Sequence, residues 1–267
     1  MKTIFITGAS SGLGKATAKL FAQNGWKVIA TMRNPEKETE LSKIENIALL
    51  PLDVSDLNQI KSTAAKALSL FDVDVVFNNA GYILVGPLEG TDDEQLLRQI
   101  NTNLLGAIRV TQAFIPHFRK KKSGLFLTTT SLNSLIPEPL SSIYRATKAG
   151  LEGWSEAMTF ELSKFNIGIK TIVPGYINTG LAGSAEIASH EAYTDLLNKL
   201  VSVYTRPEAV KGASEPDQIA QVVFEAATDG KDQTRYLAGE DANYRYAQLQ
   251  KLGTEATRKA TSQMFFG

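Results

Sequence analysis

Residues 7–17 read TGASSGLGKAT, a glycine-rich stretch that fits parts of three known loop patterns. A phosphate-binding P-loop has the pattern G-x-x-x-x-G-K followed by serine or threonine. Ala9 stands where the first glycine of that pattern should be, and Ala16 stands where the hydroxyl residue should be. The P-loop pattern therefore fails twice, which leaves a nucleophile elbow and a dinucleotide-binding turn.

The nucleophile elbow G-x-S-x-G is matched by Gly8, Ser10 and Gly12, which would make Ser10 an exposed nucleophile between a strand and a helix. Such a serine needs a histidine base. The chain has two histidines, and His117 lies in the basic segment PHFRKKK, where we expect a solvent-exposed helix end. A serine hydrolase acting through Ser10 is therefore the weaker alternative.

The composition indicates one globular domain over residues 1–267, because 43% of the residues are hydrophobic. Lys plus Arg and Asp plus Glu both number 28, which argues against a nucleic acid or an anionic membrane as a partner. The absence of cysteine and the presence of two histidines argue against disulfides and a metal site. No apolar run approaches the roughly 18 residues of a membrane span, so we expect a cytoplasmic protein.

Short runs rich in β-branched residues alternate with longer segments of helical periodicity. The sequence predicts strands at 2–7, 27–32, 47–53, 73–78, 124–130, 167–173 and 233–238, and helices at 12–25, 57–71, 92–114 and 144–165. Nearly continuous apolar strands separated by helices are typical of a doubly wound parallel α/β sheet of the Rossmann type. We also expect a helical substrate lid at about 180–214 and a C-terminal extension at about 241–267.

In that arrangement TGASSGLGKAT leaves the first strand and opens the first helix, whose free N–H groups can bind a pyrophosphate. Its glycines, Gly8, Gly12 and Gly14, follow G-x-x-x-G-x-G and not the more widespread G-x-G-x-x-G. A tight turn without a ligand would need similar glycines, so the turn alone leaves that possibility open.

The spacing TGxxxGxG resembles that of the short-chain dehydrogenase/reductase family. Further marks of the family follow in their usual order: NNAG at 78–81, NLLG at 103–106, Ser131, YRATK at 144–148, and PG at 174–175 with Thr179. The resemblance covers residue 1 to about 180, and the C-terminal tail is similar to that of hydroxysteroid- and retinol-dehydrogenase-like members. It implies an oxidoreductase that transfers a hydride between a nicotinamide dinucleotide and a carbonyl/secondary-alcohol pair.

Tyr144 and Lys148 are spaced to lie on one face of a helix. A free tyrosine has a pKa of about 10, and we expect the Lys148 ammonium and the oxidised nicotinamide to lower the pKa of Tyr144. The resemblance implies that Tyr144 donates a proton to the substrate oxygen and that Lys148 tunes Tyr144 and holds the nicotinamide ribose.

By the same resemblance, Ser131 binds the substrate oxygen and Asn103 holds a water in a proton relay to the lysine. Ser134 and the threonines at 128–130 offer rival hydroxyls for the first role. The alternative for Asn103 is an ordinary helical asparagine, and the nearby Asn101 is the comparison for that interpretation.

The choice of cofactor depends on the loop after the second strand, ATMRNPEK at 30–37. A carboxylate there would favour NAD(H), whereas Arg33 offers a guanidinium to a 2′-phosphate and favours NADP(H). Some NADP users carry a second basic residue just before the middle glycine of the turn, whereas this chain has Ser11 at that position. The expected cofactor-binding residues are Gly8, Ser10, Ser11, Gly12, Leu13, Gly14, Arg33, Asp53, Val54, Asn79, Ala80, Gly81, Tyr144, Lys148, Pro174, Gly175, Ile177 and Thr179. Asp53 could instead cap the helix that begins near Asp56.

The substrate pocket is expected to involve Ser131, Asn133, Tyr144 and Tyr176. Apolar neighbours, Leu132, Ile136 and Leu140, favour a reductase for bulky apolar ketones or aldehydes. A dinucleotide-binding sensor or scaffold without turnover is the remaining alternative, and the presence of Ser131, Tyr144 and Lys148 together argues against it. Both a homodimer and a homotetramer remain open as assemblies.

Overall fold

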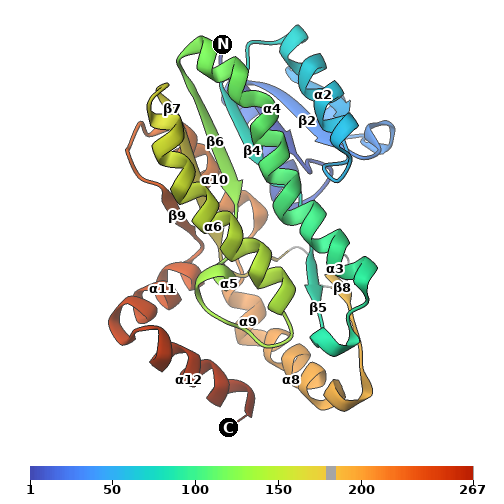
Figure 1. The fold of residues 1–267 in the computed structure, drawn as a ribbon, viewed down its shortest axis with the longest axis vertical. Coiled ribbons are helices and arrows are strands. Elements are labelled where there is room, and N and C mark those ends of the chain that lie inside the picture. Colours follow the sequence, from blue (N-terminus) through green and yellow to red (C-terminus); the bar gives the residue numbers. More distant parts are fainter. Residues whose placement is uncertain (179–184, 267) are drawn as a thin grey trace.

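Seven parallel strands form the central sheet in the order β3-β2-β1-β4-β6-β7-β9 (Figure 1). The structure is a computed structural model, and it describes residues 1–178 and 185–266. The strands are β1 (Thr3–Thr7), β2 (Lys27–Met32), β3 (Ile47–Pro51), β4 (Val75–Asn78), β6 (Gly124–Thr129), β7 (Ile167–Pro174) and β9 (Arg235–Ala238). The predicted doubly wound α/β class is confirmed, and each expected strand lies within two residues of its predicted bounds.

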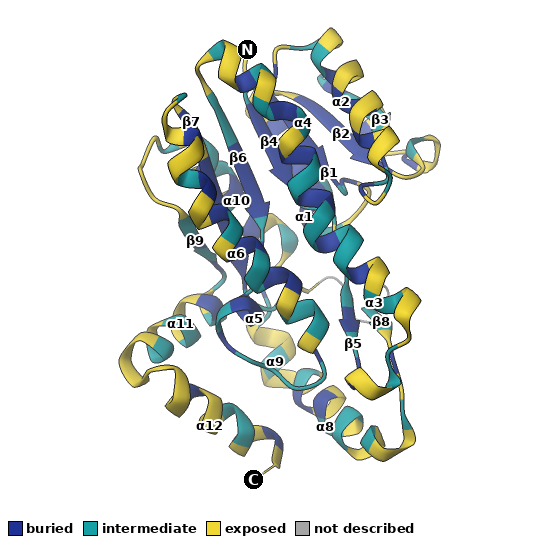
Figure 2. Ribbon diagram, viewed as in Figure 1, coloured by how far each residue is buried: buried dark blue, intermediate teal, exposed yellow. Residues whose placement is uncertain are grey.

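Helices cover both faces of this sheet (Figures 1 and 2). One face carries α1 (Gly12–Gln23) and α10 (Pro216–Thr228), and the other carries α2 (Leu57–Leu70), α4 (Gly106–Lys121) and α6 (Ser142–Ser163). Along β1, Ile4 and Ile6 face the first layer whereas Phe5 faces the second. Successive side chains of a strand point to opposite faces, so a sheet covered on both sides requires apolar residues at every position.

Aromatic rings fill both layers of the core. On one side Phe21 lies 5.0 Å from Trp26 and 5.0 Å from Phe224, measured between ring centroids. On the other side the rings of Phe114 and Phe5 are 4.8 Å apart. These contacts fix α1, α10 and α4 against the strands that carry the candidate site.

The helix expected at 92–114 is longer than predicted and is not regular. It consists of α3 (Asp93–Ile100), a π-helical turn at Asn101–Leu105, and α4, which continues to Lys121. A π turn inserts one extra residue into the helix and is often found at functional sites. It contains Asn103, one of the expected catalytic residues.

Smaller elements lie beyond the carboxyl ends of the central strands (Figure 1). A second, two-stranded sheet pairs β5 (Ile83–Val85) with β8 (Ala185–Ile187) in parallel. The helices here are α5 (Leu132–Leu135), α8 (Thr194–Tyr204), α9 (Pro207–Gly212), α11 (Glu240–Leu252) and α12 (Thr254–Phe266), with single 3-10 turns at Pro35–Lys37, Leu41–Lys43, Leu88–Gly90 and Glu191–Tyr193. The described part of the expected lid thus contains β8, α8 and α9, and the C-terminal extension forms α11 and α12.

Within residues 1–178 and 185–266, every helix is too short or too polar to cross a membrane.

Candidate active site

The glycine-rich turn between β1 and α1 requires glycine for two different reasons. Gly8 has a φ of +68°, in the left-handed region that other residues rarely adopt. At Gly14, a Cβ would lie 2.2 Å from the carbonyl oxygen of Gly8, so only glycine lets the first turn of α1 pack on the loop. The sequence reasoning placed this turn correctly between the first strand and the first helix.

The N-terminus of α1 is built to receive an anionic group. Its N-cap, Ser11, makes no side-chain hydrogen bond to the helix, and the first turn contains no acidic residue. Ser10 and Ser11 are exposed. The first N–H groups of a helix lack partners within the helix and carry the positive end of its dipole. The turn therefore fits the pyrophosphate of a dinucleotide.

Asn79, directly after β4, connects this turn to the central strands of the sheet by hydrogen bonds. Its Nδ2 atom donates to the carbonyl oxygens of Thr7 and Gly8, at 3.2 Å each. Ala80 lies against Gly8, where an added Cβ would come within 2.7 Å of the Ala80 Cα atom. Residues 79–80 thus contact the glycine-rich turn, at the point where the strand order reverses between β1 and β4.

The two histidines do not complete a nucleophile elbow around Ser10. The Nε2 atom of His117 lies 3.1 Å from the carbonyl oxygen of Val73 and 3.2 Å from Asp72, before the start of β4, whereas Ser10 follows the end of β1. His190 Nδ1 accepts from the N–H of Ala192 in the segment between β8 and α8. The expectation of a solvent-exposed His117 is wrong, since its side chain is half-buried.

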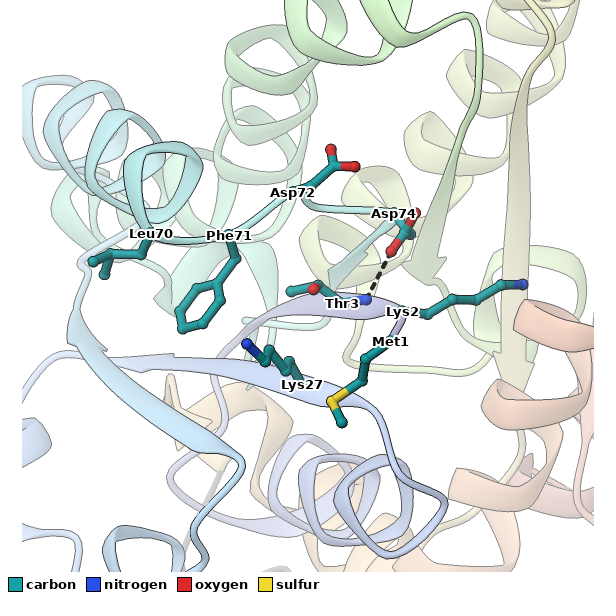
Figure 3. A pocket seen from close by; sticks show the side chains of 8 residues that line it. All are labelled: Met1, Lys2, Thr3, Lys27, Leu70, Phe71, Asp72 and Asp74. Carbon is teal, nitrogen blue, oxygen red and sulfur yellow. Dashed lines mark hydrogen bonds between the residues drawn. The ribbon is translucent and has the colours of Figure 1, made fainter.

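A hollow at the amino end of the central sheet, opposite the carboxyl end that carries the candidate site, is lined by Asp72 and Asp74 among others (Figure 3). Its acidic side chains already have partners: Asp74 accepts from the N–H of Thr3 at 2.7 Å and from Lys121 at 2.7 Å. Lys121 also pairs with Asp72 at 2.9 Å, so the expectation that the lysines at 120–122 are simply solvated is wrong for this one.

Lys148 is buried on α6 and held by the end of β6. Its side chain donates from Nζ to the carbonyl oxygen of Thr129 at 2.7 Å, and the residue is 4% exposed. Burial lowers the pKa of Lys148 to about 8, and the negative charge of Glu152 acts in the opposite direction. The Nζ atom lies 5.9 Å from the ring centroid of Tyr144. Lys148 therefore remains largely charged at neutral pH, beside the Tyr144 ring.

Tyr144 has its pKa raised, not lowered. Burial is the main cause, a hydrogen bond with the Ser131 hydroxyl acts against the rise, and the charge of Glu138 adds to it. The expected lowering of the Tyr144 pKa by Lys148 and the oxidised nicotinamide is not found in the protein alone, because desolvation of the phenolate outweighs the hydrogen bond with Ser131. The phenol keeps its proton at neutral pH, which is the form that a proton donor requires.

Ser131 caps α5 and is placed better than its rivals to meet Tyr144. Its Oγ atom accepts from the N–H of Asn133 at 3.1 Å and can still donate. The hydroxyl of Ser134 donates to the carbonyl oxygen of Ser131 at 2.5 Å, and that of Thr130 donates to Glu152 at 2.5 Å. The hydroxyls of Ser134 and Thr130 are thus engaged elsewhere, and that of Thr129 donates to Asn79 Oδ1 at 3.3 Å. The hydroxyl of Thr128 is buried without a hydrogen-bond partner among the described residues.

Asn133 is buried and braces the loop that precedes α6. Its Nδ2 atom donates to the hydroxyl of Ser141 at 2.9 Å. The Ser141 hydroxyl in turn donates to the carbonyl oxygen of Glu138, also at 2.9 Å. These bonds use the amide nitrogen of Asn133 within the protein, and a contact between this residue and substrate stays a prediction.

Asn103 lies in the π turn and is 1% exposed. Its amide pairs with the backbone of Tyr82, accepting from the N–H at 3.1 Å and donating to the carbonyl oxygen at 2.7 Å. A Cβ built on Gly81 would lie 3.1 Å from Asn103 Oδ1 and 3.7 Å from Lys148 Nζ. A side chain at residue 81 would therefore come into contact with both groups, whereas glycine does not.

Replacing Gly81 with alanine is expected to lower kcat about tenfold or more, because the methyl group fills the space beside Asn103 and Lys148. Gly153→Ala is the control, since a Cβ at Gly153 on α6 meets nothing within 4 Å. Steady-state kinetics of both variants check this. Equal turnover in the two variants would show that the space beside Gly81 has no part in the reaction.

The residues expected around the adenosine follow β2 and β3. Arg33 is exposed directly after β2. Asp53 accepts from the N–H and hydroxyl of Ser55, at 2.9 and 2.6 Å. Asp56, not Asp53, caps α2 by accepting from Asn58 and Gln59. The capping alternative for Asp53 is therefore wrong. Val54 is buried and packs against Gly106 at the start of α4, so its side chain supports the loop between β3 and α2.

Pro174 ends β7, and the residues after it are held by α11, which the sequence reasoning missed. A Cβ on Gly175 would lie 2.1 Å from Asp241 Oδ1, and the N–H of Tyr176 donates to Asp241 Oδ2 at 2.8 Å. Ile177 bridges to Ser214, and Thr179 lies outside the described residues. No local pattern relates Asp241 to Gly175, since the two residues are far apart in sequence.

The loop between α5 and α6 is covered by the lid and the C-terminal extension. Leu140 adopts a φ of +57° and packs with Leu200 and Val203 of α8 and Phe265 of α12. The ring of Tyr176 lies 5.6 Å from that of Tyr204 in α8. Arg245 of α11 pairs with Glu138 of the loop at 2.9 Å. Unusual backbone conformations cluster at functional sites, and this one immediately precedes α6.

Comparison with known proteins gives consistent matches along the chain. A family model described as short chain dehydrogenase matches residues 2–189. An uncharacterised oxidoreductase of Schizosaccharomyces pombe is 35% identical over 237 residues, which make up 88% of this chain and 100% of the relative. A short-chain dehydrogenase from Streptomyces avermitilis has a TM-score of 0.84 at 29% identity, covering 100% of this chain and 98% of that one.

One further solved structure bears on the cofactor. An alcohol dehydrogenase from the archaeon Thermococcus sibiricus, complexed with 5-hydroxy-NADP, has a TM-score of 0.72 at 26% identity and covers 90% of this chain and 97% of its own. Other matched structures contain bound NADP or NADPH.

Proposed function

Because the chain belongs to the short-chain dehydrogenase/reductase family and is an oxidoreductase, we propose that it uses NADP(H) to interconvert a ketone or aldehyde and the corresponding alcohol. The observation that carries this proposal is the meeting of Ser131, Tyr144 and Lys148 at the carboxyl end of β6. The family shares its fold among many substrates, so the chemistry is argued from these side chains.

In this proposal NADPH, when bound, supplies the hydride. Ser131 donates a hydrogen bond to the substrate oxygen as negative charge develops there. Tyr144, whose pKa is raised by burial, holds the proton that this oxygen takes up. Lys148, fixed by the carbonyl oxygen of Thr129, holds the ribose hydroxyls, and Asn103 supports a water beside it.

The pyrophosphate would rest on the N–H groups of Gly12, Leu13 and Gly14, with Ser10 and Ser11 at its sides. Arg33 is proposed to contact the 2′-phosphate of NADP(H), because the first positions after β2 carry no carboxylate that would repel it. NADP bound to structural relatives supports this choice.

Arg33→Ala is expected to weaken NADPH binding about ten- to a hundredfold and to leave NADH binding almost unchanged, because hydrogen bonds to charged groups are the stronger ones. Lys37→Ala is the matched control, since Lys37 is an exposed cation in the same loop. Fluorescence titration with both dinucleotides checks it. Equal weakening of NADPH and NADH would contradict a contact with the 2′-phosphate.

The substrate is proposed to be a bulky apolar ketone or aldehyde. Leu132 and Ile136 are buried beside Ser131, and Leu140 joins the apolar cluster of α8 and α12. A panel of aliphatic, aryl and polyhydroxylated carbonyl compounds, followed at the nicotinamide absorbance with NADPH and NADH, tests the proposal. We expect turnover of the apolar members with NADPH. Tight NADPH binding without turnover of any member would favour a sensor or scaffold.

A further inference from the structure

A buried carboxylate lies one helical turn beyond Lys148 on α6. Glu152 is 6% exposed, and its two oxygens face the central sheet. Oε1 accepts from the hydroxyl of Thr130 at 2.5 Å, and Oε2 accepts from Nε of Arg235 at 2.9 Å. Acidic residues are almost never fully buried unless they are paired. The pairing of Glu152 with Arg235 of β9 and with Thr130, the residue directly after β6, is therefore a feature to be explained.

Arg235 reaches this carboxylate from β9, the edge strand of the sheet. It stands opposite Thr171 of β7 in the strand register, so its side chain crosses from β9 toward α6. Its outer nitrogens contact Glu156 at 2.8 Å and the hydroxyl of Tyr246 on α11 at 3.4 Å. Glu152 is buried whereas the Arg235 side chain is half-buried, so removing Arg235 would leave the buried carboxylate without its counter-charge.

The residue that Glu152 holds, Thr130, stands between two groups of the candidate site. The carbonyl oxygen of Thr129, on one side, receives the Lys148 ammonium. Ser131, on the other, carries the hydroxyl that meets Tyr144. A hydrogen bond to the side chain of Thr130 therefore restrains the backbone that places both groups.

We propose that Glu152, charge-balanced by Arg235, is a positioning residue that fixes the Thr129–Ser131 segment and thereby holds Lys148 and Ser131 in their working geometry. This inference rests on the proposed function and was not reached from the sequence, because Arg235 lies 83 residues from Glu152. Glu152 touches neither substrate nor cofactor in this arrangement, and it acts through Thr130 and through its charge.

The negative charge of Glu152 also affects the pKa of Lys148. Glu152 counteracts the fall in the pKa of Lys148 that burial causes. The ionisable groups around Lys148 and Glu152 are Tyr144 and Glu156 on α6, Arg235 on β9 and Tyr246 on α11. Since Tyr144 has its pKa raised, Lys148 loses its proton first as pH rises. Removing the negative charge of Glu152 should move that loss to lower pH.

The test compares Glu152→Gln with Glu156→Gln. Both carboxylates contact the guanidinium of Arg235, but the side chain of Glu156 is 59% exposed and makes no hydrogen bond to the Thr129–Ser131 segment within the described residues. We expect Glu152→Gln to lower kcat about tenfold and weaken NADPH binding several-fold. The alkaline limb of its pH profile should shift to lower pH by about half a unit or more. Glu156→Gln should resemble the parent protein in kcat, in NADPH affinity and in the pH profile.

Thr130→Val serves as the second variant, because it removes the hydrogen bond to Glu152 without changing any charge. It should lower kcat with no shift of the pH profile, and it keeps the proposal testable if Glu152→Gln does not fold. Matching kinetics, NADPH affinity and pH profiles in Glu152→Gln and Glu156→Gln, with only a loss of thermal stability, would overturn the proposal. So would parent-like kinetics of Thr130→Val.

NADPH affinity separates this proposal from the proposed function. If the parent protein binds NADPH but reduces no carbonyl compound, the proposed function fails. The difference in affinity between Glu152→Gln and Glu156→Gln would still report whether Glu152 holds Lys148 in place.

Discussion

Replacing Tyr144 with phenylalanine is expected to lower kcat for NADPH-dependent carbonyl reduction by about a hundredfold or more. General acid catalysis contributes about 10²- to 10⁴-fold, and the substitution removes only the hydroxyl that carries the transferable proton. The phenylalanine ring should take the position of the tyrosine ring on α6. The centroid of that ring lies 5.9 Å from the Lys148 Nζ atom. Steady-state kinetics with the preferred carbonyl compound give the result.

The controls for Tyr144→Phe are NADPH affinity and thermal stability, both of which should stay close to those of the parent protein. A surviving rate above about a tenth of the parent rate would remove Tyr144 as the proton donor. A large loss of NADPH affinity would indicate that the hydroxyl supports the cofactor site and not the proton transfer.

The second large effect is expected from Lys148→Met, which should lower kcat by about a hundredfold and weaken NADPH binding by about tenfold or more. The substitution removes the ammonium that donates to Thr129 and replaces it with an apolar chain of similar length. Unlike Tyr144→Phe, it therefore affects both turnover and binding. Kinetics together with fluorescence titration of NADPH separate the two effects.

Lys170→Met is the matched control for a buried lysine. Lys170 on β7 donates to the carbonyl oxygen of Ala226 and to Asp229, at 2.9 Å each, on the face covered by α10. Its loss should lower the unfolding temperature while kcat and NADPH affinity stay near the parent values. Unchanged NADPH affinity in Lys148→Met would contradict the role of Lys148 in holding the ribose.

The local parts of the fold could be read from the sequence because they depend on neighbouring residues. The apolar runs predict the strands of the central sheet, and the glycines at 8, 12 and 14 predict the turn before α1. The π turn at Asn101–Leu105 interrupts the helix predicted at 92–114, and the helical period did not reveal it. The division into one domain, the role of the lid, and assembly as a homodimer or homotetramer stay predictions.

Contacts between distant segments could not be read from the sequence. Asp241 supports Gly175, and Arg235 balances Glu152, because the sheet brings β7, β9 and α6 together. Helical and strand periods identify the buried face of one element but not the residue that a neighbouring element places there. The spacing of four residues from Tyr144 to Lys148 and from Lys148 to Glu152 is the signal that could have pointed to Glu152, since it places all three on one face of α6.

The pKa of Tyr144 shows a second limit of sequence reasoning. The spacing of Tyr144 and Lys148 suggested attraction between their charged forms, whereas burial determines the direction of the shift. Burial also lowers the pKa of Lys148, which weakens the positive charge that the tyrosine meets as pH rises. Both shifts come from desolvation, which depends on the packed core and not on the spacing of the two residues.

Deuterium transfer tests the central claim most directly. NADPH labelled with deuterium at C4 of the nicotinamide, in two separate samples that carry the label on opposite faces, is incubated with the protein and a bulky apolar ketone. Mass spectrometry then locates the label in the alcohol. The proposed function predicts deuterium on the carbinol carbon from one of the two samples. Unlabelled alcohol from both samples, or no alcohol from any ketone of the panel, would contradict it.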